Sequence, residues 1–358
     1  MPNQFIWGLF VPVLLAVAVE TLSAADIVTI KSSEKNVSGD VSQVTKTELT
    51  INAGLKKDKI TKIPANDIAR VKWDGEPISL RLAINAELQG HLADALQRYS
   101  QLQADNKSNR PYLKADLSFF IARTTAKISL TDPTMLDEAA QKLDDFCQAN
   151  GSSFRYYEAL SHLGEIYLAK KNFNQAQATF QQIAQAPWLD YQMAARSAGA
   201  KLLLFQSKVS EAQAEFDAVS KMPAKTAAEL SQKYEAMLGK TVCLQRQGQH
   251  QAAIQELVTV TNQADVENTR LQAEAYVRQG DSYRQLDLPQ PKSAILAYLH
   301  VDILFRKEAA LHAEALYRLW QLFTAVGDPD KAADVASRLE TRYPNSEWTK
   351  KLADVGGG

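Results

Sequence analysis

A small residue followed four positions later by a larger apolar residue recurs along most of this chain. Residues four apart lie on one face of a helix, so each such pair marks a helical contact surface. The pairs are Ala95/Tyr99, Ala139/Leu143, Ala176/Phe180, Ala212/Phe216, Ala253/Leu257 and Ala294/Tyr298, and Ala332 is followed by another small residue, Ala336. The first members of successive pairs lie 36 to 44 residues apart. This period predicts a stack of helix pairs, because one pair cannot bury its apolar face alone.

The stretch LGEIYLAKKNFNQAQATF at residues 163–180 shows why the spacing suits helix packing. A small residue lets the facing helix approach closely, and a nearby aromatic ring fills the adjoining space. The stretch resembles the tetratricopeptide repeat (TPR) family, whose pattern is matched by Leu163, Gly164, Tyr167, Ala176 and Phe180.

Weaker versions of the same pattern flank this unit. The next unit keeps Ala212 and Phe216 but carries Gly199-Ala200 in place of Leu-Gly, and a later unit keeps Gly280 and Tyr283. The resemblance covers roughly residues 77–352. It implies a mainly α fold, an α-solenoid of antiparallel helix pairs over that range.

In the TPR family the first helix of each pair lines a concave groove. Carried onto this sequence, the groove positions give a set of candidate residues for binding a peptide or protein. They are Glu158, Glu165, Lys201, Phe205, Gln245, Arg246, Asp281 and Arg284. The mixed charges suit a polar peptide or protein surface, although an ordinary solvated helix face explains any single residue equally well.

Residues 26–76 have a different period, close to two. About five short segments rich in β-branched residues are separated by Gly, Asn, Asp, Lys and Pro. They predict a small closed barrel, and their order resembles SH3-like or Sm-like barrels. Such a module either docks on a protein or binds nucleic acid, and the formal net charge of -1 favours docking. The turn signal Asp74-Gly75 and Pro77, suited to a first helical turn, place the boundary at 75–77.

The N-terminus predicts export. An apolar run at residues 5–19 is followed by Ser23, Ala24 and Ala25, which fits a signal peptide over residues 1–25 cleaved after Ala25. The run is short for a membrane-spanning helix, which needs about 20 apolar residues, so we favour cleavage over an uncleaved anchor. The expected location is the periplasm or cell envelope of a bacterium. Residues 353–358, which end in three glycines, are expected to be disordered.

The sequence offers no recognisable catalytic or metal-binding motif. No two of the five histidines are three or four residues apart, and no nucleophile-elbow, phosphate-loop or dinucleotide-binding pattern occurs. The two cysteines, Cys147 and Cys243, lie in apolar-periodic segments and are read as small buried hydrophobic residues. We therefore expect no catalytic residue, no metal and no cofactor. The charge balance predicts no nucleic-acid partner.

These observations predict a non-enzymatic scaffold in the cell envelope that binds a protein or peptide on its concave TPR surface. One alternative is an accessory subunit of an envelope enzyme or assembly complex that recognises its target through the β module. In that case the repeats serve as a spacer or as an arm for self-association.

Overall fold

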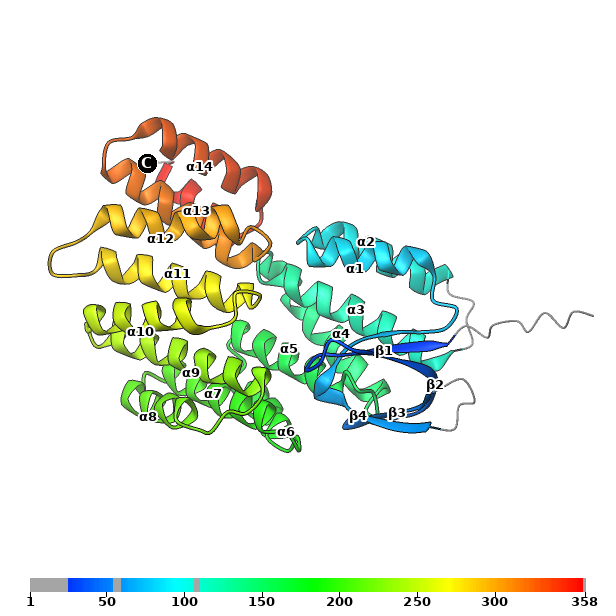
Figure 1. The fold of residues 1–358 in the computed structure, drawn as a ribbon. Coiled ribbons are helices and arrows are strands. Elements are labelled where there is room, and N and C mark those ends of the chain that lie inside the picture. Colours follow the sequence, from blue (N-terminus) through cyan, green and yellow to red (C-terminus); the bar gives the residue numbers. More distant parts are fainter. Residues whose placement is uncertain (1–24, 54–58, 106–109, 357–358) are drawn as a thin grey trace, which may run out of the picture.

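The computed structural model describes residues 25–53, 59–105 and 110–356 (Figure 1). The predicted signal peptide therefore lies outside the described residues, apart from Ala25. No helix in those ranges combines the length and the apolar character that crossing a bilayer requires.

Five short strands form one antiparallel sheet near the N-terminus. They are β1 (Asp26–Ile30), β2 (Asn36–Val44), β3 (Glu48–Ala53), β4 (Lys59–Pro64) and β5 (Ile68–Lys72), in the order β4-β3-β2-β1-β5. A 3-10 turn, η1 (Ala65–Asp67), joins β4 to β5. Register shifts between Val41 and Gln43 and between Thr29 and Ile30 interrupt two of the ladders.

The predicted closed barrel is wrong, because β4 and β5 are the two edges of an open sheet. The sheet buries its apolar residues without closing, since they share one hydrophobic cluster with the neighbouring helices. Trp73, only 2% exposed, belongs to that cluster together with Leu117 and Tyr157. Burial against helices removes the need for the sheet to cover its own apolar face.

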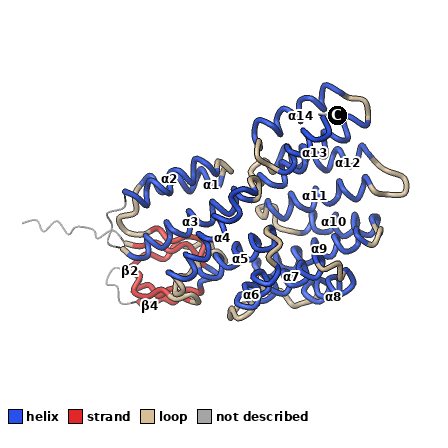
Figure 2. Tube along the Cα trace, turned by 180° about the vertical axis from the view of Figure 1, so that it is seen from behind, coloured by secondary structure: helices blue, strands red, loops and turns tan. Residues whose placement is uncertain are grey.

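Fifteen α-helices follow in the described residues, and neighbours in sequence pack against each other (Figures 1 and 2). They are α1 (Ile78–Leu88), α2 (Leu92–Asp105), α3 (Pro111–Ser129), α4 (Leu136–Ala149), α5 (Tyr156–Ala169), α6 (Phe173–Ile183), α7 (Leu189–Phe205), α8 (Val209–Ser220), α9 (Ala227–Arg246), α10 (His250–Gln263), α11 (Thr269–Arg284), α12 (Pro291–Leu304), α13 (Ala309–Ala325), α14 (Pro329–Arg342) and α15 (Glu347–Gly356). A short 3-10 turn, η2 (Pro133–Met135), precedes α4. The predicted solenoid of helix pairs is confirmed.

Each predicted small-large pair lies in the second helix of a helix pair, from α2 to α14. The small members from Ala95 to Ala294 are fully buried, and Ala332 is nearly so. Their burial leaves room for the facing helix, as the spacing predicts.

Glycines at three helix contacts lie where an aromatic ring leaves no room for a β-carbon. Phe180 packs on Gly164, and Tyr298 packs on Gly280, each within one helix pair. Phe216 behaves differently, because it packs on Gly239 in the following helix, α9. Gly199, which replaces the family leucine, faces open space, while its neighbour Ala200 is fully buried.

The chain ends in a helix. α15 runs to Gly356, so residues 353–356 are helical where the sequence predicts a disordered tail, and 357–358 lie outside the described residues. The amphipathic pattern over residues 347–356 overrides the glycines at the end, because Leu352 is buried against the last repeat.

The helix array curves until its two ends meet. The turn after α1 lies against the loop between α12 and α13, where a β-carbon on Gly90 would be 3.0 Å from the Cα of Lys307. The loop after α14 reaches the turn after α3, where Asn345 donates a hydrogen bond to Asp132 at 2.8 Å. The two ends of the helix array are therefore in contact (Figure 1).

Candidate protein-binding surface

The first helices of successive pairs carry charged side chains that form ion-pair clusters between repeats. The cluster nearest the N-terminus centres on Glu87 at the end of α1. Arg123 lies 2.7 Å and Lys127 2.8 Å from its carboxylate, and both come from α3. The hydroxyl of Tyr99 donates a further hydrogen bond to Glu87 at 2.9 Å. Burial alone would raise the pKa of Glu87, but the two cations outweigh it and hold the pKa at about 2.

Glu158 extends this cluster into α5. Its carboxylate lies 3.3 Å from Arg123 and 3.1 Å from Arg155, and its side chain is 34% exposed. Burial opposes the charged form, but the two guanidinium groups lower the pKa of Glu158 to about 2. The predicted binding residue Glu158 is thus already paired to two arginines from its own chain.

A second cluster joins α9, α11 and α13. Arg270 lies 3.3 Å from Glu235 and 3.6 Å from Glu274. Further along α11, Asp281 lies 3.2 Å from Arg278 and 3.5 Å from Arg318. Both charge signs alternate along these helices, and such a surface is complementary to a ligand that also carries both signs.

Charged residues on α5 and α7 also act on the second cluster. The pKa of Arg270 is raised mainly by Glu235 and further by Glu165, which lies on α5. Burial would raise the pKa of Glu274, but Arg270, Arg278 and Lys201 of α7 together lower it. Glu165 of α5 and Lys201 of α7 therefore lie within electrostatic range of the charged residues on α11.

Two of the predicted residues, Glu165 and Lys201, are left partly exposed on this inner side. The Glu165 side chain is 46% exposed, and its nearest charged neighbour is His162 at 4.0 Å. Lys201 is half-buried and influences Glu274 through its charge. Together with Glu158, Arg270 and Glu274, these two residues form the surface that we call the inner face.

Four other predicted residues hold helices together. Gln245 of α9 donates hydrogen bonds to the Arg278 carbonyl at 2.9 Å and to Ser282 at 2.7 Å, both in α11. Arg246 donates to the carbonyl of Leu204 at the end of α7. Asp281 accepts a hydrogen bond from the buried Tyr298 hydroxyl at 2.7 Å, and Arg284 also hydrogen-bonds Tyr298.

Phe205 lies apart from the inner face as defined here. It is at the last position of α7, its side chain is 49% exposed, and its ring lies 5.4 Å from that of Phe173 at the start of α6. Arg270 is not among the predicted residues, although it precedes Glu274 by one helical turn and pairs with it at 3.6 Å. That i, i+4 pairing of opposite charges was the available signal.

The sheet is fixed to the first turns of α5 and α7 and to α3. The Trp73 indole donates a hydrogen bond to the buried Asp116 of α3 at 2.8 Å, and Asn66 donates to Asp190 of α7 at 3.2 Å. The ammonium of Lys46 lies 5.4 Å from the ring centre of Tyr156 at the start of α5. The sheet therefore borders the inner helices at one end.

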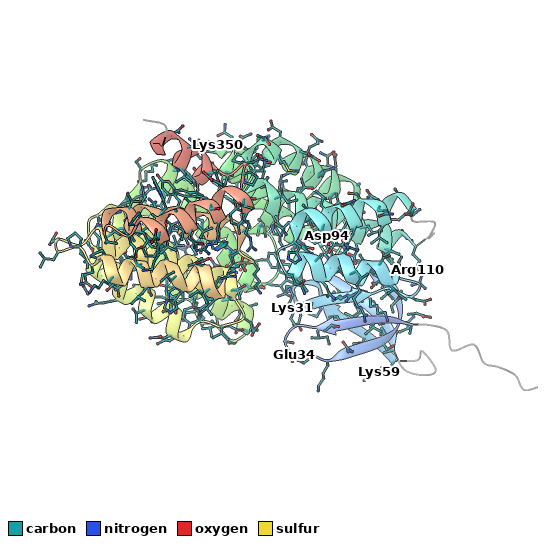
Figure 3. All side chains as sticks on the ribbon, turned by 90° about the horizontal axis from the view of Figure 1, so that it is seen from above. Lys31, Glu34, Lys59, Asp94, Arg110 and Lys350 are labelled. Atoms are coloured by element: carbon teal, nitrogen blue, oxygen red, sulfur yellow. The ribbon has the colours of Figure 1, made fainter. Side chains whose placement is uncertain are left out.

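Lys31 brings a charge from the sheet toward the inner face. It follows β1, and Figure 3 shows it where the sheet meets the helical array. Its ammonium donates to the Asn66 carbonyl at 3.0 Å and helps to lower the pKa of Glu158.

The structure also addresses metal binding and cysteine reactivity. In the described ranges, no group of three or more His, Cys, Asp or Glu side chains is placed to hold a metal ion. Cys243 is buried and Cys147 is half-buried, and neither forms a disulfide. Burial raises the thiol pKa of Cys147 to about 12 and that of Cys243 to about 11, which keeps both in the unreactive protonated form.

Residues 158–186, which span most of α5 and all of α6, match the tetratricopeptide repeat family. A search of curated proteins finds no match. Similar solved structures include a tetratricopeptide repeat protein from Parabacteroides merdae, with 14% identity, 79% of this chain and 100% of that chain covered, and a TM-score of 0.46. The type IV pilus biogenesis factor PilW shares 18% identity over 68% of this chain and 99% of its own, with a TM-score of 0.41. A Rap protein in complex with competence and sporulation factor shares 15% identity over 77% and 78% of the two chains, with a TM-score of 0.46.

Proposed function

Because this chain is a tetratricopeptide repeat protein, we propose that it is a non-enzymatic scaffold that binds an extended protein segment along its inner face. The observation that carries this proposal is the run of charged side chains along the first helices, where Arg270 of α11 lies 3.3 Å from Glu235 of α9 and Glu165 of α5 is left 46% exposed. Helices from separate repeats offer both charge signs to one ligand. An extended segment with alternating charges fits such a surface, because each of its charges finds an opposite partner.

Charge reversal on the inner face tests this proposal. The full chain is immobilised, partners are captured from an envelope extract, and the Lys201→Glu and Glu165→Lys variants are compared with the unchanged protein. We expect both variants to lose the captured partner at least about tenfold, since truncating or reversing a desolvated interfacial charge costs about 2 kcal/mol or more.

The matched control is Lys142→Glu on the second helix α4, where Lys142 pairs with Glu138 of the same helix at 3.4 Å. Capture by this variant should be unchanged. Equal capture by all four proteins, with melting temperatures within a degree or so of each other, would remove the inner face as the binding surface.

The alternative is recognition through the sheet. It is supported by the edge strand β4, where Ile60 is 69% exposed and the outer side of the strand has no neighbouring strand within the described residues. An extended partner could pair with this edge. Replacing Ile60 by Pro removes a backbone donor that faces away from β3 at the open edge, because the hydrogen-bonded pairs with β3 are those of Thr61 and Ile63. Loss of capture in this variant, with Lys201→Glu unaffected, would favour the sheet.

We propose further that the protein is exported to the periplasm or cell envelope. The apolar run at residues 5–19 and the small residues before Asp26 support this. Cell fractionation followed by N-terminal sequencing tests it, and the mature protein should begin at Asp26. A cytoplasmic protein that retains Met1 would refute export.

A further inference from the structure

The two ends of the helix array touch at two separate places. Gly90, between α1 and α2, lies against Lys307 between α12 and α13. Asp132, after α3, accepts a hydrogen bond from Asn345, after α14, at 2.8 Å. These contacts join residues more than 200 positions apart, whereas the main helix–helix packing joins helices one or two elements apart in sequence.

The contact at Gly90 depends on the absence of a side chain. Its φ is +78°, and a β-carbon would lie 3.0 Å from the Cα and 3.2 Å from the carbonyl oxygen of Lys307. Both of these are backbone atoms, which a rotamer change cannot move aside. Gly248, in the corresponding turn after α9, has φ +74° but faces open space. The two glycines therefore share a backbone conformation and differ in whether the far end of the chain lies against them.

The contact at Asp132 is a solvent-exposed polar one, in which Asp132 itself is half-buried. Its carboxylate also accepts from Thr134, and the pKa of Asp132 is lowered by Thr134, by Asn345 and by the charge of Lys350. Lys350 lies on α15 beside the N-terminal helices (Figure 3). Because this hydrogen bond is solvent-exposed, water can replace it when the ends separate.

Apolar side chains near the Gly90 contact remain exposed. Leu88, two residues before Gly90, is 66% exposed, and Ile303 and Leu304, just before Lys307, are each 61% exposed. Separating the ends therefore uncovers little apolar surface. The described contacts between the ends are thus one close backbone approach and one exposed hydrogen bond.

We propose that Gly90, Lys307, Asp132 and Asn345 form a latch that closes the helix array into a ring and opens reversibly. With the latch closed, the inner face is encircled. With the latch open, a segment of a partner chain can enter from the side. The effect on binding rests on the proposed function, but the latch itself does not.

Thiol bridging in the full chain tests the latch. Cys147 and Cys243 are first replaced by Ala, and Asp132→Cys is combined with Asn345→Cys. A short bifunctional thiol reagent should bridge this pair at least about tenfold faster than the control pair Asp132→Cys with Asp330→Cys. Asp330 lies at the other end of α14, about 20 Å from Asn345 at the rise of an α-helix.

Glycine substitution then tests whether the Gly90 contact holds the same closure. Adding Gly90→Ala should slow the bridging of residues 132 and 345 several-fold, because the new β-carbon pushes the ends apart. Adding Gly248→Ala imposes the same backbone penalty and should leave the rate unchanged.

Two outcomes would overturn the latch. One is bridging of the 132/345 pair that is no faster than that of the 132/330 pair. The other is an equal effect of the two glycine substitutions. Neither outcome touches the proposed function, which fails only if charge reversal on the inner face leaves partner capture intact.

Discussion

The ring of Phe180 in α6 occupies the space that a β-carbon on Gly164 in α5 would need. Tyr298 stands in the same relation to Gly280. These glycines serve close approach between helices, because their conformation is helical and requires no positive φ. The aromatic residue of the repeat is therefore fitted to one side-chain-free position on the facing helix.

A pair of Gly→Ala substitutions should separate packing from helix propensity. Gly164→Ala forces Phe180 out of its position and is expected to destabilise the fold by about 1–3 kcal/mol. Gly199→Ala lies inside α7 with open space around it and should stabilise by roughly 0.5–1 kcal/mol. Urea unfolding of both variants measures the difference. Equal effects would show that Phe180 does not depend on Gly164.

Replacing a buried carboxylate should cost far more than replacing an exposed one. Glu87→Gln removes a buried charge that Arg123 and Lys127 share, and we expect a loss of about 3–5 kcal/mol because the half-buried Arg123 loses its nearest carboxylate. Glu138→Gln, which breaks only an exposed pair with Lys142, should cost less than about 1 kcal/mol. Chemical unfolding midpoints check both. A loss under 1 kcal/mol for Glu87→Gln would contradict the described burial.

The hydrogen bond between Trp73 and Asp116 should stabilise the attachment of the sheet to α3. Trp73→Phe keeps an aromatic ring but leaves the buried Asp116 carboxylate without this donor, which is expected to cost about 1–3 kcal/mol. Trp188→Phe is the control, because Trp188 is only partly buried and packs by its ring against Tyr191. Thermal melts followed by far-UV circular dichroism report both changes.

A fragment of residues 26–76 should not fold alone. Its apolar residues share a core with α3 and α5, so separation would expose Trp73 and leave Asp26 without Arg110, which lies 2.7 Å away. Proton NMR of the fragment should show the narrow shift range of an unfolded chain. A dispersed spectrum would show that the sheet is an independent module.

Acid should weaken the last repeat through His312. This residue is 2% exposed, with Nε2 2.9 Å from Asp302 and Nδ1 2.8 Å from the Tyr343 hydroxyl. Burial lowers the pKa of His312, helped by Arg342 and Arg338, despite the attraction of Asp302. The unfolded chain therefore binds this proton more readily than the folded one, and stability falls as pH drops below about 6.5.

Between pH 7 and pH 5, the melting temperature of the His312→Asn variant should fall by less than that of the unchanged protein. His162 has a lowered pKa as well, again mainly through burial, so part of the slope should remain. The same slope in both proteins would mean that His312 does not titrate below its ordinary value in the folded state.

The repeats could be predicted from sequence because their contacts are local. Ala176 and Phe180 lie on one helix turn, and their partner Gly164 is only 16 residues away from Phe180. The contact of Phe216 with Gly239 was missed, although Leu238-Gly239 repeats the Leu-Gly signal of residues 163–164. The contact between Asp132 and Asn345 has no sequence signal, because nothing in the period of the repeats fixes the curvature of the whole array.

The open sheet and the inner face show a second limit. Strand patterns predict which residues alternate in and out, but whether β4 and β5 pair depends on what covers the sheet, here α3, α5 and their neighbours. The groove positions of the TPR family predicted Glu165 and Lys201, which belong to the inner face. They also predicted Gln245, whose side chain is hydrogen-bonded to α11 and fixes α9 to it. Whether a groove side chain is available to a ligand depends on its contacts with neighbouring repeats. The sequence of a degenerate repeat does not specify those contacts.

The meeting of the two chain ends gives this protein an unusual order of assembly for a repeat array. Repeat contacts between neighbours can form as soon as two helix pairs have been synthesised. Asp132 must wait until Asn345 has left the ribosome, and closing a loop of that length carries an entropic cost that neighbouring repeats do not meet. Every helix pair can therefore be folded while the molecule is still an open arc, and circular closure is left as the final event of its biogenesis.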